Sequence, residues 1–197
     1  MRRSKVFMKL RKAIVALGTD ASGISAIEFA GLLVFFMMIV GEILQLGLYF
    51  YTSASLNYAT NKAVRQILIG AVANQNLTAA QFRTQILCPL LPGAMSCANV
   101  ITNVQTVTEG TNPNGFYSFV NAAQTSLIVP SMNNNLTSFC IGTGGSYVIV
   151  QVFYAMPVLG LSWLLANATT WNGSSVYFVS ANSAFRSEPF QTTYSGC

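Results

Sequence analysis

The sequence contains no histidine and few charged residues, and these two shortages narrow the possible functions. Histidine is the commonest general base and the commonest metal ligand in proteins. Charged residues make up only 8% of the 197 positions, against about 25% in a typical soluble domain. Hydrophobic residues make up 52%, so the composition indicates a protein linked to a membrane. We expect no metal ion, no other cofactor and no enzymatic activity.

The net charge of +5 belongs to the N-terminal segment alone. Six of the ten basic residues lie in the first twelve positions: Arg2, Arg3, Lys5, Lys9, Arg11 and Lys12. From Ile24 onward, four basic and four acidic residues cancel: Lys62, Arg65, Arg83 and Arg186 against Glu28, Glu42, Glu109 and Glu188. Nucleic-acid binding requires a basic patch, so we expect no nucleic-acid partner. A basic run before an apolar segment is typical of a flank that stays in the cytoplasm.

The apolar segment, residues 24–51, is long enough to cross a membrane. It contains 28 residues, and about 20 helical residues cross a bilayer core of about 30 Å. Proline is absent before Pro89, so we expect the helix to continue to Gly70. Beyond the apolar run, apolar residues recur at three- and four-residue spacing, which predicts an amphipathic stripe of Leu56, Ala59, Ala63 and Ile67.

The C-terminal two thirds predict a small α+β unit. Thr78 can cap a short helix over about 79–88. Segments rich in β-branched residues predict three strands at 100–107, 146–156 and 174–185. The fold expected is therefore a long N-terminal helix, half transmembrane and half amphipathic, followed by a small antiparallel sheet with short helices.

Three parts follow from this pattern. Residues 1–23 form a basic leader, residues 24–70 a transmembrane and stem helix, and residues 71–197 a head on the far side of the membrane.

Four cysteines, Cys88, Cys97, Cys140 and Cys197, indicate an oxidising compartment and up to two disulfides. Four cysteines allow three pairings, among which the sequence alone does not choose. Cys88 and Cys97 flank a Pro-Gly turn and could close a small loop. If the last two strands pair antiparallel, Cys140 before one comes close to Cys197 after the other.

The stretch GISAIEF, from Gly23 to Phe29, departs from an ordinary secretory signal. In such a signal the small residues of the cleavage site follow the apolar run, whereas here they precede it. A cut after Gly23 would remove the basic leader and keep the apolar helix. Ile24 would then be the new N-terminus and Glu28 the fifth residue.

This stretch resembles the processing site of type IV prepilins. With the apolar run and the later ASLNYATNKAVRQ, it is similar to the TadE-like family of tight-adherence (Flp, type IVb) pilus proteins. A second similarity lies at Arg186, Glu188 and Pro189, in an Arg-Asn-Glu-Pro-aromatic ending where Ser187 replaces the asparagine. The middle of the chain matches that family only in broad layout.

The resemblance implies a minor pilin or pseudopilin. The major Flp pilins usually have Glu-Tyr where this chain has Glu28-Phe29, and they are much shorter. The partners implied are a prepilin peptidase, other pilin or pseudopilin subunits, the pilus assembly platform and the membrane. The location implied is the bacterial inner membrane, crossed once, with the head extracytoplasmic and with possible incorporation into a pilus.

Two glutamates lie within the apolar helix. Glu28 lies near its cytoplasmic end, where we expect the helix macrodipole of the first turn to favour an anion. In the family that this sequence resembles, such a glutamate pairs with the N-terminal amine of a neighbouring subunit and sets the register between the two subunits. The alternative is a carboxylate that is tolerated because it lies at the membrane interface.

Glu42 lies deeper on nearly the same face, with Gln45 three residues on. We expect it to face a partner helix, unless a shifted span places it near an interface.

Two other readings stay open. One is an uncleaved single-pass anchor that holds an extracytoplasmic binding domain. The other is a secreted enzyme with a signal peptide ending near Ala54, which the two glutamates of the apolar run and the scarcity of carboxylates argue against.

Overall fold

The computed structural model describes residues 24–107, 119–158, 168–192 and 194–197, with side chains from Glu28 onward. It divides into two compact units, Met1–Leu44 and Gln45–Cys197. The second unit, which we call the head unit, therefore includes the C-terminal part of the long helix. The leader expected at 1–23 lies outside the described residues, and the division at residue 70 stays a prediction.

Helix α2 (Ile24–Leu68) runs without interruption for 45 residues. It is the one helix among the described residues that is long and apolar enough to cross a membrane. Side chains from Glu28 to Leu44 are exposed, apart from the half-buried Val40 and Glu42. From Gln45 onward, one face is buried, and it includes the whole predicted stripe: Leu56, Ala59, Ala63 and Ile67.

The sequence explains why α2 ends where it does. Gly70 adopts a positive φ of 76°, which a glycine accepts without the strain of a Cβ, and it breaks the helix before α3 (Ala71–Asn74). Thr78 then caps α4 (Ala79–Gln81) through a reciprocal capping box with Gln81.

The single helix expected over 79–88 is wrong in detail. After α4 the chain continues as a π-helical segment, η2 (Phe82–Leu87), and a 3₁₀ turn, η3 (Cys88–Leu90). Pro89 lies in η3, where its ring fixes a helical φ and its missing N–H leaves no orphan donor. A second 3₁₀ turn, η4 (Cys97–Asn99), leads into the sheet.

Four strands form one antiparallel sheet in the order β1-β2-β4-β3. Strand β1 (Val100–Val107) has the predicted bounds, and β2 (Tyr147–Pro157) and β4 (Ser174–Arg186) differ from the prediction by one residue at their ends. A fourth strand, β3 (Thr169–Trp171), was not predicted; it pairs with the start of β4 across a turn at Asn172 and Gly173.

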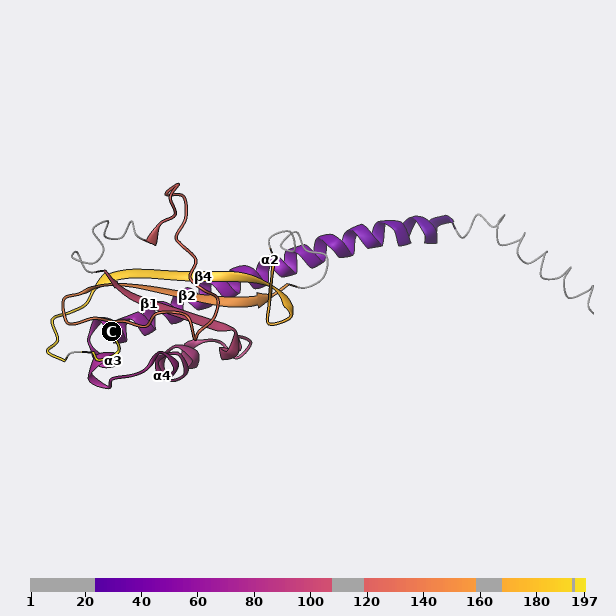
Figure 1. Ribbon diagram of the computed structural model, residues 1–197. Helices are drawn as coiled ribbons and strands as arrows, with labels where there is room; N and C mark the ends of the chain where they lie inside the picture. The colour runs from indigo at the N-terminus through magenta and orange to yellow at the C-terminus, as the bar shows by residue number, and fades with distance from the viewer. Residues whose placement is uncertain (1–23, 108–118, 159–167, 193) are drawn as a thin grey trace, which may run out of the picture. The chain divides into compact units, whose positions relative to one another are not determined.

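One face of the sheet packs on α2 within the head unit, and Figure 1 shows β1, β2 and β4 lying along this part of the helix. Alternate residues Val148, Val150 and Val152 of β2 enter that core because side chains on a strand alternate between faces. The opposite face is more polar. There Asn103 donates to Gln151 over 2.9 Å, so both buried amides have a partner.

The expected fold class is confirmed. A long apolar N-terminal helix is followed by a four-stranded antiparallel sheet with short helices, which is an α+β arrangement.

Candidate functional site

The proposed processing site is described only in part. Gly23 lies outside the described residues, and Ile24 is the first residue of α2. Glu28 and Phe29 are exposed on the helix, Phe29 with 65% of its surface accessible.

Glu28 lies beyond the first turn of α2, contrary to expectation. That turn contains no acidic residue. The dipole effect falls off within the first turn, so it favours this carboxylate less than we expected. An exposed carboxylate is nonetheless available to a group on another chain.

Glu42 and Gln45 differ in their surroundings. Glu42 is half-buried, whereas Gln45 is 4% exposed. Gln45 lines a cavity of the head unit with Met95 and Tyr154. The head therefore begins to cover α2 at Gln45, which lies within the apolar run of residues 24–51.

The C-terminal motif binds a glycine-rich turn. Arg186 donates its Nε–H to the carbonyl of Gly145 over 3.0 Å, and its guanidinium lies 5.6 Å from the ring centre of Tyr147. Ser187, which is 3% exposed, donates its backbone N–H to the carbonyl of Ser146 over 2.9 Å. Its hydroxyl lies 3.2 Å from the carbonyls of both Thr143 and Ser146.

The next residues of the motif reach the end of α2. Glu188 donates its backbone N–H to the carbonyl of Leu68 over 2.9 Å, while its side chain is exposed. Pro189 leads into Phe190, whose ring lies against Gly70 and whose backbone lies against Gly144. The described contacts of this motif thus join β4, the turn at residues 142–146 and the end of the helix.

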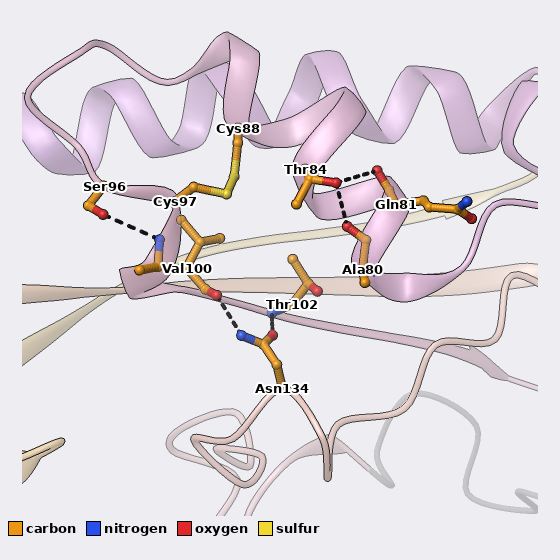
Figure 2. The surroundings of a disulfide bond; sticks show 10 residues. Ala80, Gln81, Thr84, Cys88, Ser96, Cys97, Val100, Thr102 and Asn134 are labelled. Carbon is orange, nitrogen blue, oxygen red and sulfur yellow. Dashed lines mark hydrogen bonds between the residues drawn. A yellow bond between two sulfur atoms is a disulfide. The ribbon is translucent and has the colours of Figure 1, made fainter.

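Two disulfides fasten the head unit. Cys88 pairs with Cys97, and Figure 2 shows this bond linking the helical segment to the chain just before β1. Cys140 pairs with Cys197, with Cα atoms 4.9 Å apart. The antiparallel pairing of β2 with β4 explains the second bond, because Cys140 precedes β2 and Cys197 follows β4.

Asn134 covers the free edge of β1. Its side chain accepts from the N–H of Thr102 over 3.2 Å and donates to the carbonyl of Val100 over 2.8 Å (Figure 2). Next along the edge, Cys140 donates its backbone N–H to the carbonyl of Val104. Backbone groups on an exposed edge invite pairing with another chain, and these contacts block that pairing.

Two residues of the C-terminal region have contacts that the sequence analysis missed. The Tyr194 hydroxyl donates to the carbonyl of Leu77 over 2.8 Å, and burial raises the pKa of this phenol. A Cβ on Gly144 would overlap the backbone of Phe190. The run of glycines near Gly144 predicts a turn, but no local pattern identifies a partner 46 residues away.

The described residues contain no group of three or more His, Cys, Asp or Glu side chains that could hold a metal ion. Glu109, a carboxylate considered in the sequence analysis, lies outside the described residues.

The long apolar helix that leads into a disulfide-bonded α+β unit is compatible with a single-pass membrane protein or a pilin. Disulfides also suggest that the head unit is extracytoplasmic. Residues 23–65 match the family model described as TadE-like protein, so the chain carries a TadE-like domain there. That domain implies a role related to the Tad pilus. No curated protein matches the chain, and no solved structure does.

Proposed function

We propose that this chain is a minor pilin or pseudopilin that takes part in the assembly of a tight-adherence pilus. Its role is structural rather than enzymatic. A prepilin peptidase cuts after Gly23, and the apolar part of α2 then bundles with the helices of other subunits. The observation that carries this proposal is the TadE-like match at residues 23–65, which includes Gly23, Glu28 and the apolar run.

The arrangement of α2 supports bundling. The apolar side chains from Phe29 to Leu44 are exposed, and they need lipid or other helices around them. Before cleavage that environment is the inner membrane, with the basic leader in the cytoplasm and the head extracytoplasmic. During assembly it is the set of neighbouring helices, delivered at the assembly platform.

Glu28 sets the register of this bundle in our proposal. Cleavage creates an amine at Ile24, four residues before Glu28 on the same helix. An unpaired charge at the centre of a membrane-spanning helix costs about 2.5 kcal/mol or more, and Glu28, near the end of the span, pays a smaller part of this cost. Pairing with the amine of a neighbouring subunit removes this cost only when the two helices are correctly aligned.

The second glutamate has a related role. Gln45 marks where the head begins to cover α2, so Ile24–Leu44 remains for lipid or partner helices. Those 21 residues rise by about 31 Å, close to the thickness of a bilayer core. Glu42 then lies near the outer end of the span, where we propose that it contacts a polar group of a partner helix.

Replacing Glu28 by alanine in the host's own copy tests this function. We expect pili to fall about tenfold or more, because the N-terminal amine of the neighbouring subunit loses its carboxylate partner, and a loss of about 1.4 kcal/mol per subunit contact corresponds to a factor of ten. Electron microscopy of sheared pili measures the loss. Glu28→Asp, which keeps a carboxylate at this exposed position, is the matched control and should leave most pili in place. Normal pili with Glu28→Ala would instead support an uncleaved anchor with a binding domain.

A further inference from the structure

One end of the head unit forms an uncharged, largely apolar surface around a cavity, and we call this surface the foot. The cavity has a volume of about 200 Å³. The foot consists of two residues of α2, two of the Cys88–Cys97 loop and two at the end of β2: Leu48, Tyr51, Ala94, Met95, Met156 and Pro157. Gln45, Thr52 and Tyr154 complete the cavity lining.

The charged side chains of the head unit lie elsewhere. Those described are Lys62, Arg65, Arg83, Arg186 and Glu188, and none of them lines the cavity of the foot. Lys62 comes ten residues after Thr52, which is about 15 Å farther along the helix. Arg186 pairs with Tyr147 at the opposite end of β2 from Pro157. Charge in the described head unit therefore avoids the end where the foot lies, and the charged side chain of α2 that precedes the foot is Glu42, three residues before Gln45.

The foot follows directly on the apolar stretch of α2. Its helix residues lie between Gln45 and Thr52, a rise of about 10 Å beyond Leu44. A bilayer core of about 30 Å is flanked by polar layers that bring the total to about 40 to 45 Å. If Ile24–Leu44 fills the core, the foot lies at the level of the outer polar layer.

The exposed side chains of α2 at the level of the foot also suit the outer polar layer of the bilayer. Leu48 is 47% exposed, Phe50 61% and Tyr51 51%. Exposure of such side chains to water is unfavourable, whereas tyrosine is enriched where the polar layer meets the core. The edge of the foot adds Ala94 and Pro157, which are both exposed and uncharged.

We propose that the foot rests in the outer polar layer of the bilayer, with lipid against Tyr51, Ala94 and Pro157. The head then touches the membrane instead of standing clear of it on the stem. This inference rests on the membrane anchoring in the proposed function, and it adds a second membrane contact besides the transmembrane helix.

Tryptophan fluorescence in vesicles tests the contact. The full chain, with Trp163→Phe and Trp171→Phe, is reconstituted in phosphatidylethanolamine and phosphatidylglycerol vesicles whose acyl chains are brominated near the headgroup or, in a parallel sample, near the chain ends. Three single-tryptophan variants are compared. Ala94→Trp probes the foot, Phe35→Trp probes the exposed apolar helix, and Tyr58→Trp probes the stem beyond the foot. All three positions are exposed, so each substitution tolerates the larger ring.

Bromine near the headgroup should quench Ala94→Trp about three times or more as strongly as Tyr58→Trp, because Tyr58 lies about 21 Å beyond Leu44. Equal, weak quenching at both positions, with strong quenching of Phe35→Trp by the lipid brominated near its chain ends, overturns the foot and leaves the anchor standing. Absence of quenching of Phe35→Trp by either lipid overturns the anchor itself. Quenching of Ala94→Trp that disappears at higher protein density indicates a second copy on the foot and also overturns the proposal.

A second measurement covers variants that misfold. In the chain that carries only Trp163→Phe, the native Trp171 reports from β3, which pairs with the start of β4 beside the end of β2. Its emission should be weaker in the vesicles brominated near the headgroup than in vesicles of the same lipids without bromine. Equal emission in the two contradicts lipid contact at this end.

Discussion

Tyr194 shows how a single side chain near the C-terminus fastens two distant segments. Its ring lies 6.0 Å from that of Phe139, and its hydroxyl donates to the carbonyl of Leu77. Replacing it by phenylalanine leaves the ring and removes the hydrogen bond. We expect Tyr194→Phe to lower the free energy of unfolding by about 1 kcal/mol, measured by denaturant unfolding of the detergent-solubilised chain. No change would mean that the carbonyl of Leu77 finds another donor.

The same tyrosine predicts a dependence on alkaline pH. Burial raises the pKa of Tyr194 above its ordinary value of 10.0, because the charged phenolate loses its hydration. Its contribution to stability is complete below the unfolded pKa of about 10 and is lost as the pH rises through the higher folded pKa. Between pH 9 and pH 11 the native chain should therefore lose more stability than Tyr194→Phe. Equal losses would contradict a raised pKa.

Gly144 tests how closely the segment after the C-terminal motif packs against the turn before β2. A Cβ at this position would overlap the backbone nitrogen and oxygen of Phe190, which cannot move as a flexible side chain can. We expect Gly144→Ala to lower the free energy of unfolding by about 1 to 3 kcal/mol. Gly93→Ala is the matched control, because no atom lies within 4 Å of its added Cβ. Equal stability of the two variants would show that Gly144 and the backbone of Phe190 are not closely packed.

Among the elements, the two disulfides differ in the length of chain that they close. Cys88 and Cys97 are 9 residues apart, and Cys140 and Cys197 are 57 apart. In the chain-entropy model, the longer loop should stabilise the fold by about 1.6 kcal/mol more. Unfolding of the two double serine variants measures this difference. A larger loss for the Cys88 and Cys97 pair would mean that native contacts, and not loop length, decide the effect.

The sequence predicts the elements well where periodicity is strong. The bounds of β1 are correct because β-branched residues fill Val100–Val107, and the buried stripe of α2 follows from helical spacing. Strand β3 was missed because three residues carry no period. The π-helical segment Phe82–Leu87 was missed because its sequence also suits an α-helix.

Contacts between distant segments are what the sequence does not reveal. Arg186 and Glu188 stand out only through the resemblance to a family, and nothing local predicts that they reach Gly145 and Leu68. The disulfide of Cys140 could be inferred because strand direction constrains which ends meet. The surroundings of Gln45 could not, because its burial depends on segments about 50 and 110 residues farther along the chain.

At the scale of the whole molecule, the apolar run and the membrane span are different lengths. The sequence suggests residues 24–51, yet the head covers one face of α2 from Gln45. An apolar run is therefore an upper limit for the span, because part of it packs against the head. This limit is what moves Glu42 toward the outer interface in our proposal.

The central claim is that the chain is a processed pilin-like subunit, and N-terminal sequencing of the mature protein tests it most directly. The protein is isolated from host cells with and without their prepilin peptidase. We predict a start at Ile24 in cells with the peptidase and at Met1 in cells without it. A start at Met1 in both would contradict the claim.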